Sequence, residues 1–254
     1  MDKIKRYLNL IWELSWVDFK LKYYSSALGL LWSFLRPFMM LLVLYVVFFY
    51  FLKVSIENYQ IYLLLGIIIW NFFADATNDS MHSVIAKAHI LQKINLPPAA
   101  VVMSTVIHSF WTFIITLGIF FILFFALGSQ LSISAAILFY LVVLLVFLVI
   151  GVSFLVVPLY MRFRDFGHIW DIFLQMLFWA TPIVYQYTLV PDKYVRWYLL
   201  NPMARIIVDA RNAVLYNFTP EIKQLLITTI IVAVIFVLGL TIFKKYSRQL
   251  VEQL

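Results

Sequence analysis

The sequence contains no cysteine, and charged residues make up only 12% of its 254 positions. Without cysteine, the chain forms no disulfide and offers neither a thiol nucleophile nor a thiolate ligand for a metal. Soluble domains usually carry about 25% charged and about 45–50% apolar residues, whereas apolar residues reach 65% here. This composition predicts a membrane protein with no separate water-soluble domain.

Charge is missing completely from residues 94–161, which contain no Asp, Glu, Lys or Arg. A helix over this segment would be about 100 Å long at about 1.5 Å per residue, whereas the bilayer core is about 30 Å thick. The segment must therefore cross the membrane twice, with a turn in the polar break at 127–134. Together with the other uncharged windows it predicts six spans, at 32–52, 59–75, 98–127, 133–157, 168–187 and 222–243.

The predicted fold class is an all-α membrane protein, because backbone at membrane depth has to satisfy its hydrogen bonds internally. With the N-terminus inside, 13 of the 19 Lys and Arg residues fall in cytoplasmic segments. The positive-inside rule then places both termini in the cytoplasm. Basic flanks that face anionic lipid explain the net charge of +7, so we predict the membrane, and no nucleic acid, as a partner.

Three segments outside the spans are informative. Residues 3–24 carry apolar and charged positions on opposite sides of a helix, which predicts an amphipathic helix in the cytoplasmic interface; a basic segment that only fixes topology is the alternative. Residues 81–93 follow several N-cap residues and predict a short cytoplasmic helix. Such a helix is either a plain connection or a docking site for a cytoplasmic partner.

The third segment, residues 188–218, is too apolar for a solvated loop and too charged for a span. It predicts two short helices that re-enter the membrane from the outer side before the last span, broken at Asn201-Pro202. An aromatic belt with snorkelling arginines is the alternative.

The sequence shows no constellation of catalytic or metal-binding residues. The four histidines are scattered, and the chain has neither a His-Glu-x-x-His motif nor a Walker A motif. No predicted span holds an ionisable pair in its core, although an ion-driven transporter usually buries one there. We therefore predict that the chain is not an enzyme and that the energy for any transport comes from elsewhere.

Aromatic residues are dense in the first and fifth predicted spans, for example at Tyr45, Phe49 and Trp179. Rings in spans usually pack against lipid or neighbouring helices, and the sequence alone favours this reading. A lining of rings also suits sugars, because the C–H faces of sugars stack on rings while Tyr and Trp supply hydrogen bonds.

Six short motifs lie in order along nearly the whole chain. They stand at 18–23 with 28–37, 66–73 (Gly-Ile-Ile-Ile-Trp-Asn-Phe-Phe), 91–97 (Leu-Gln-Lys-Ile-Asn-Leu-Pro), 164–165 (Arg-Asp), 181–185 (Thr-Pro-Ile-Val-Tyr) and 200–203 (Leu-Asn-Pro-Met). Together they resemble the motifs of the transmembrane, or permease, subunit of ABC-2 type polysaccharide exporters, which move O-antigen or teichoic acid. One departure is Arg36 before Pro37, where a neutral residue such as Asn is expected.

The resemblance implies one ABC-2 type transmembrane domain over residues 1–254, located in the bacterial inner membrane. It implies a homodimer that binds two copies of a cytoplasmic ABC ATPase, with ATP and Mg on the ATPase and no cofactor on this chain. The cargo would be a lipid-linked polysaccharide. A secondary transporter and a membrane-embedded glycan or lipid transferase are the alternatives.

The resemblance also implies roles for four groups of residues. The coupling helix, 81–93, would contact the ATPase through Met81, His82, Val84, Ile85, Lys87, Ala88, Leu91 and Gln92. The channel would be lined by Tyr45, Phe48, Phe49, Phe178 and Trp179. The outer gate would include Tyr185, Tyr187, Trp197, Tyr198, Asn201 and Pro202. The lipid-linked substrate would enter near Arg162 and Arg164.

Overall fold

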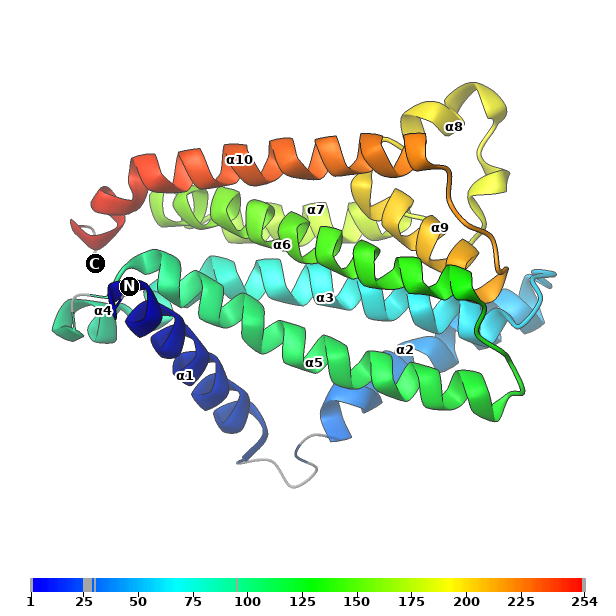
Figure 1. The fold of residues 1–254 in the computed structure, drawn as a ribbon, viewed down its shortest axis with the longest axis horizontal. Coiled ribbons are helices and arrows are strands. Elements are labelled where there is room, and N and C mark those ends of the chain that lie inside the picture. Colours follow the sequence, from blue (N-terminus) through cyan, green and yellow to red (C-terminus); the bar gives the residue numbers. More distant parts are fainter. Residues whose placement is uncertain (1, 25–28, 30, 95, 253–254) are drawn as a thin grey trace.

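The computed structural model of the protein describes residues 2–24, 29, 31–94 and 96–252. The chain is helical, and no strand occurs among those residues, which confirms the predicted all-α fold class. The long helices run side by side in a bundle, with both termini and α4 at one end and α8 at the other (Figure 1). We call these the terminal end and the outer end of the bundle.

Four helical units are long and apolar enough to cross a membrane by length and composition. They are α3 (Tyr59–Ala86), α5 (Pro98–Ala126), η2 (Ile133–Ala136) continuing into α6 (Ile137–Arg162), and α10 (Ile222–Glu252). Two shorter apolar units occupy the positions of the first and fifth predicted spans. They are α2 (Leu31–Tyr45) with the π-helix η1 (Val46–Phe51), and α7 (Phe166–Trp179).

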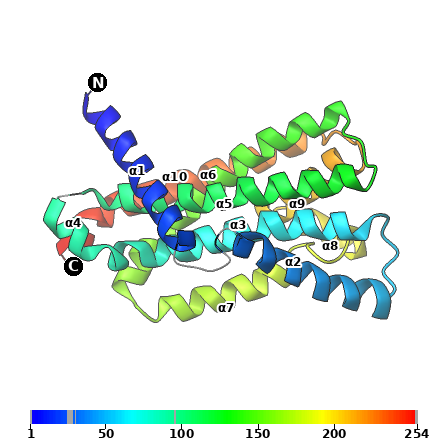
Figure 2. The same cartoon turned by 90° about the horizontal axis from the view of Figure 1, so that it is seen from below.

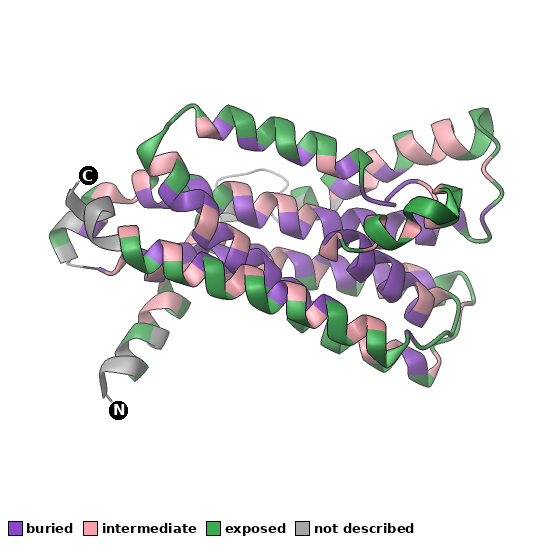
Figure 3. Ribbon diagram, turned by 90° about the horizontal axis from the view of Figure 1, so that it is seen from above, coloured by how far each residue is buried: buried purple, intermediate pink, exposed green. Residues whose placement is uncertain are grey.

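Helix α3 forms the centre of the bundle. Every residue from Ile61 to Trp70 is buried, and the helix contacts α2, α5, α6, α7 and α9. Exposed residues lie mainly on the outward faces of the surrounding helices, as Figure 3 shows. On α10 these exposed residues include Leu226, Ile230 and Val234. Apolar side chains on the outer faces are what lipid contact requires.

Two glycines allow α6 and α10 to pack closely. A Cβ atom added at Gly151 would lie 2.8 Å from the Cα atom of Phe236, and one added at Gly239 would meet the backbone of Gly151. Beyond this crossing, the rings of Phe154 and Phe243 lie 4.7 Å apart. Small residues at a crossing let helix backbones approach, which is the main way in which membrane helices gain packing energy.

Helix α3 is longer than the predicted span 59–75. It continues to Ala86 and is interrupted at Lys87. A separate seven-residue helix, α4 (Ala88–Ile94), follows. Residues 76–80, which lie between the predicted span and the predicted coupling helix, are therefore helical, and α3 includes the start of that coupling helix. Several of these residues, such as Ala76 and Val84, are fully buried. Tertiary packing extends the helix through a stretch whose polarity suggested a loop.

Helix α7 is shorter than the predicted span 168–187. It ends at Trp179 after 14 residues, and the chain from Thr181 to Tyr185 is not helical. The cause is local, because Pro182 has no N–H to donate and disfavours helical backbone at the residue before it. Fourteen residues span about 21 Å, which is less than the bilayer core of about 30 Å.

The N-terminal helix α1 (Asp2–Tyr24) lies obliquely across the bundle beside α5 (Figure 2). Helix α1 contacts α5, and the ring of the largely exposed Trp12 lies 5.3 Å from that of Trp111 at this contact. Tyr7, Val17 and Leu21 are exposed on the rest of its surface. An oblique helix with exposed apolar side chains suits the predicted position in a membrane interface.

Candidate coupling junction and outer clamp

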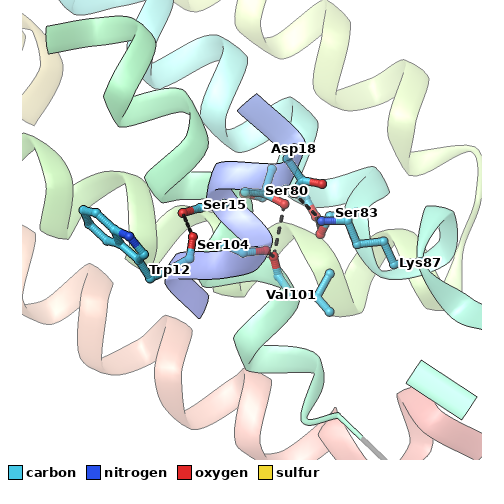
Figure 4. Close-up of polar contacts among 9 residues, drawn as sticks. Trp12, Ser15, Asp18, Ser80, Ser83, Lys87, Val101 and Ser104 are labelled. Carbon is cyan, nitrogen blue, oxygen red and sulfur yellow. Dashed lines mark hydrogen bonds and ion pairs between the residues drawn. The ribbon is translucent and has the colours of Figure 1, made fainter. Parts of the chain in front are cut away.

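Helices α1, α3 and α5 meet at the terminal end of the bundle, and we call this meeting point the coupling junction (Figure 4). The Lys87 ammonium group forms an ion pair with the Asp18 carboxylate of α1. Both side chains are half-buried, at 16% and 24% exposed. Since Lys87 occupies the break between α3 and α4, this pair ties α1 directly to the point where the chain turns.

Buried serines line the junction on all three helices. Ser15 Oγ donates to the carbonyl oxygen of Trp12 at 2.7 Å, and Ser104 Oγ donates to that of Val101 at 2.8 Å (Figure 4). Within α3, Ser83 Oγ donates to the carbonyl oxygen of Ser80. Because these hydroxyls are satisfied inside their own helices, the serines act as small residues that allow close approach.

The residues predicted to contact an ATPase differ in how far they are buried within this chain. Met81, Val84 and Leu91 are buried inside this chain, and Ile85, Lys87 and Ala88 are half-buried. His82 is exposed, and its ring packs against that of Tyr160 at 4.6 Å. The side chain of Gln92 lies outside the described residues. The exposed side of this region carries His82, Ala86, His89 and Lys93.

At the outer end, the non-helical segment 181–185 follows α7, and its first four residues are buried. Arg211 of α9 (Pro202–Leu215) reaches this segment, although its side chain is only 1% exposed. Its Nη2 donates to the carbonyl oxygen of Ile183 at 2.7 Å, and its Nη1 bonds to that of Pro182. Its Nε donates to the carbonyl oxygen of Tyr62 in α3 at 3.0 Å.

Two tyrosines of α3 satisfy the next two carbonyl groups of the segment. Tyr59 Oη donates to the carbonyl oxygen of Val184 at 2.7 Å, and Tyr62 Oη donates to that of Tyr185 at 2.8 Å. Four consecutive carbonyl oxygens are thus bonded by side chains from α3 and α9. We call this arrangement the outer clamp. It meets the requirement that buried irregular backbone find internal partners.

Gly66 leaves the space that Arg211 fills. A Cβ atom at Gly66 would lie 3.2 Å from the Arg211 Cζ atom and 3.4 Å from the carbonyl oxygen of Ile183. Any side chain at this position would therefore push the guanidinium group away from its carbonyl partners.

Next to the clamp, the predicted gate residues lie in two groups. Tyr185 Oη donates to the carbonyl oxygen of Trp179 at 2.7 Å and lies 3.1 Å from Tyr198 Oη, on α8 (Asp192–Tyr198). Burial raises the pKa of the Tyr198 hydroxyl, and its hydrogen bond with Tyr185 adds to the effect. The Tyr198 hydroxyl is therefore neutral at physiological pH. By contrast, Trp197 is 75% exposed.

Asn201 and Pro202 form the break between α8 and α9. Asn201 Oδ1 accepts from the Met203 backbone N–H at 3.0 Å as the N-cap of α9, and Pro202 takes the first helical position. Asn201 Nδ2 also donates to Thr181 Oγ1 at 3.3 Å, which joins this break to the start of segment 181–185.

A buried ion pair fixes the other side of α9. Arg205 Nε donates to Asp209 Oδ2 at 2.9 Å, one helical turn away, and Arg205 also bonds to Gln224 of α10. Arg205 and Asp209 are 9% and 1% exposed at the side chain. Removing one partner of such a pair leaves an uncompensated buried charge.

The predicted channel residues differ in exposure. The rings of Tyr45 and Phe49 stack at 4.9 Å, and Phe49 and Trp179 are exposed at the surface of this chain. Phe48 is half-buried. Phe178 points into the bundle, where its ring lies 5.7 Å from that of Trp70.

The predicted substrate-access residues, Arg162 and Arg164, are both exposed where α6 ends and the chain turns into α7. This turn lies at the terminal end of the bundle. Among the described residues, no group of three His, Asp or Glu side chains is placed to hold a metal ion.

The sequence does not predict that Arg211, Tyr59, Tyr62 and Gly66 belong to one site. Two signals were present: Arg211 in a segment predicted to re-enter the membrane, and a glycine within the apolar run of α3. An arginine at membrane depth needs partners, but the sequence gives no indication that those partners are backbone carbonyl groups 28 and 29 positions earlier.

Comparison with known proteins agrees with the motif resemblance. The profile of the ABC-2 type transporter family matches residues 9–218. Two relatives from Klebsiella pneumoniae, each named O-antigen export system permease protein RfbA, are 29% and 28% identical over 98% of both chains. A protein of the same name from Myxococcus xanthus is 24% identical over 99% of this chain and 98% of its own. Since the family profile covers most of the chain and the helices are those of a membrane protein, this chain belongs to the ABC-2 type transporter family.

Proposed function

We propose that this chain is the permease subunit of an ATP-driven exporter that moves a lipid-linked polysaccharide, O-antigen or a similar glycan, out of the cytoplasm. The observation that carries the proposal is the end-to-end similarity to permeases named for O-antigen export. In this proposal two copies of the chain form the channel, and two cytoplasmic ABC ATPase subunits hold ATP and Mg. The chain itself is no enzyme and holds no cofactor.

We assign six spans to the chain in the bacterial inner membrane, with both termini in the cytoplasm. Four are the membrane-length units, and α2 with η1 and α7 supply the first and fifth. Helix α7 is too short alone, but the buried segment 181–185 continues from its end toward the outer face. Its clamped carbonyl groups make that non-helical continuation compatible with membrane depth.

The coupling junction would receive the motion of the ATPase. Helix α4 and the end of α3 present His82, His89 and Lys93 outward, while Met81, Val84 and Leu91 hold the region to the bundle. The Asp18–Lys87 pair would pass a displacement of α4 to the interfacial helix α1. Arg162 and Arg164, at the same end, would attract the phosphate of the lipid carrier.

The channel would form where α2, η1 and α7 of two copies face each other. These elements expose aromatic residues, including Phe49, Tyr50, Phe173 and Trp179. Rings at such positions suit the C–H faces of sugars. At the outer end, the clamp and the Tyr185–Tyr198 pair would hold the gate helices α8 and α9 closed.

The decisive experiment is co-purification of the tagged chain with the ABC ATPase encoded in the same genome. We expect a complex with equal numbers of both subunits and ATP hydrolysis that rises when lipid-linked glycan is added in nanodiscs. The matched control is an ATPase variant that lacks its Walker B carboxylate. An isolated chain that binds no ATPase, or hydrolysis indifferent to glycan, would contradict the proposal.

A further inference from the structure

A small cavity with a mixed aromatic and polar lining lies next to the outer clamp. It has a volume of about 180 Å³ and opens between α3, η3 (Tyr187–Leu189) and α9. Its walls are formed by Tyr62, Gln186, Tyr187, Thr188, Val208, Arg211, Asn212 and Tyr216. Tyr62 and Arg211 belong to both the clamp and the cavity, so anything bound in the cavity touches the elements that fix segment 181–185.

The chemistry of the walls selects for a class of ligand. Three tyrosine rings, two carboxamide side chains and one hydroxyl group surround a single aliphatic residue, Val208. Such a mixture offers aromatic faces for C–H groups together with several hydrogen-bond donors and acceptors, which is what a sugar ring presents and requires.

Charge recognition contributes little. Arg211 directs its Nε, Nη1 and Nη2 atoms at backbone carbonyl oxygens, and its Cζ atom lies 3.4 Å from the centroid of the Tyr62 ring. Each nitrogen of the guanidinium group thus already donates one hydrogen bond within the clamp. The remaining wall residues are uncharged, so the cavity favours a neutral ligand.

Size limits the ligand further. Sites for drug-sized molecules have volumes of about 300–1,000 Å³, and this cavity is smaller. It has room for one sugar ring and none for a longer stretch of glycan. Tyr216, which is 44% exposed, stands at the rim, so the ring could enter while the rest of the polymer stays outside.

We propose that this cavity binds one neutral pyranose unit of the exported glycan at the outer face, next to the clamp. The inference rests on the proposed export function, because that function supplies a glycan on this side. Tyr187 and Tyr216 provide the stacking faces, and Gln186 and Asn212 provide hydrogen bonds to the ring hydroxyls. Occupancy would be brief and weak, as a site along a transport path requires: binding that is too tight would stall the polymer.

Thiol labelling tests the proposal, because the native chain has no cysteine. Thr188→Cys places one thiol at the exposed rim of the cavity, and Tyr194→Cys places one on the exposed surface of α8 as a matched control. The purified complex in nanodiscs is labelled with a charged thiosulfonate reagent in the presence of mannose, galactose, rhamnose or N-acetylglucosamine. We expect at least one sugar, at concentrations on the order of 100 mM suited to a weak site, to slow labelling of Thr188→Cys about threefold or more while Tyr194→Cys is unaffected.

Variants of the walls complete the test. Adding Tyr187→Ala or Asn212→Leu to Thr188→Cys should abolish the protection, whereas Gln130→Leu, in the neighbouring cavity of about 210 Å³, should leave it intact. Labelling that no sugar slows, or that glycerol slows equally, would overturn the proposal. ATPase co-purification is measured on the same samples: a complex that assembles but shows no protection refutes the cavity alone, and a chain that binds no ATPase refutes the export function.

Discussion

The guanidinium group of Arg211 lies over the ring of Tyr62, with its Cζ atom 3.4 Å from the ring centroid, and its Nε donates to the carbonyl oxygen of the same tyrosine at 3.0 Å. Tyr62 of α3 thus contacts Arg211 through both its ring and its backbone carbonyl group. Cation–π contacts are strongest where water is excluded, and Arg211 is 1% exposed. This contact joins the central helix of the bundle to the proposed gate.

Replacing Arg211 by methionine should weaken the outer clamp. The carbonyl groups of Pro182 and Ile183 would lose their donor, and each buried unsatisfied group costs about 1–3 kcal/mol. We expect a loss of more than about 2 kcal/mol, measured as a lower melting temperature of the purified protein, together with faster thiol labelling of Ile183→Cys. Arg196→Met, on the exposed side of α8, is the control that should change neither. An unchanged labelling rate would show that the clamp does not hold the segment.

Replacing Gly66 by alanine should act on the same clamp from α3. Helix propensity alone favours alanine over glycine by about 1 kcal/mol, but the added methyl group would lie 3.2 Å from Arg211 Cζ. We therefore expect Gly66→Ala to destabilise the protein and Gly118→Ala, where no atom lies within 4 Å of an added Cβ, to stabilise it or leave it unchanged. The melting temperatures of both variants, compared with that of the parent protein, test this expectation. In the double variant with Arg211→Met, the effect of Gly66→Ala should largely disappear.

Breaking the Asp18–Lys87 pair should uncouple α1 from the α3–α4 break. A partly exposed pair contributes about 1 kcal/mol or less, which corresponds to a factor of about five in an equilibrium. Asp18→Asn should accordingly lower glycan-stimulated ATP hydrolysis by up to about fivefold without loss of membrane insertion. Asp18→Lys combined with Lys87→Asp should restore part of the activity. Equal defects in the single and the swapped variants would remove the pair from the coupling path.

Within residues 81–93, substitutions at buried positions should impair folding, whereas substitutions at exposed positions should impair docking of the ATPase. Val84 is fully buried in this chain, so Val84→Asp should reduce the amount of folded protein in the membrane. His89 and Lys93 are exposed, so His89→Glu with Lys93→Glu should leave the amount unchanged and weaken ATPase co-purification. Quantitative blots of membranes and of purified complexes measure the two effects. If the exposed pair of changes retains full ATPase binding, the docking surface lies elsewhere.

The Tyr185–Tyr198 hydroxyl contact should help to seal the channel at rest. Tyr198→Phe removes one hydroxyl group of the pair, which lies at 3.1 Å, and keeps the ring. We expect a measurable ion conductance of the purified exporter in planar bilayers without ATP, where the parent protein is closed. Tyr194→Phe, at an exposed position of the same helix, serves as the control. Because burial raises the pKa of Tyr198, the parent seal should not change between about pH 6 and 9.

Much of the architecture could be predicted from the sequence, because lipid imposes constraints that act locally. An uncharged run of sufficient length has to form a membrane helix whatever its neighbours, and α5, α6 and α10 follow that rule. The break at Asn201-Pro202 was also visible, since capping and the first helical position depend on adjacent residues.

Helix ends were less predictable where packing competes with local preference. Residues 76–86 look polar in sequence, yet they continue α3 because Ala76, Met81 and Val84 find buried positions against the bundle. Likewise, the sequence of residues 81–93 does not reveal which of them pack against this chain and which face outward. Both outcomes depend on neighbours that are distant in sequence.

The sequence by itself determined the class of the protein, its membrane-length helices and its family, because composition, charge-free length and ordered motifs are properties of the chain read in one dimension. Only the tertiary structure determined which groups form the outer clamp. Arg211 bonds to carbonyl groups, and every residue has one, so no pairing of residue types marks its partners. Backbone acceptors are chosen by proximity, and proximity between α3, segment 181–185 and α9 exists only after the helices have packed.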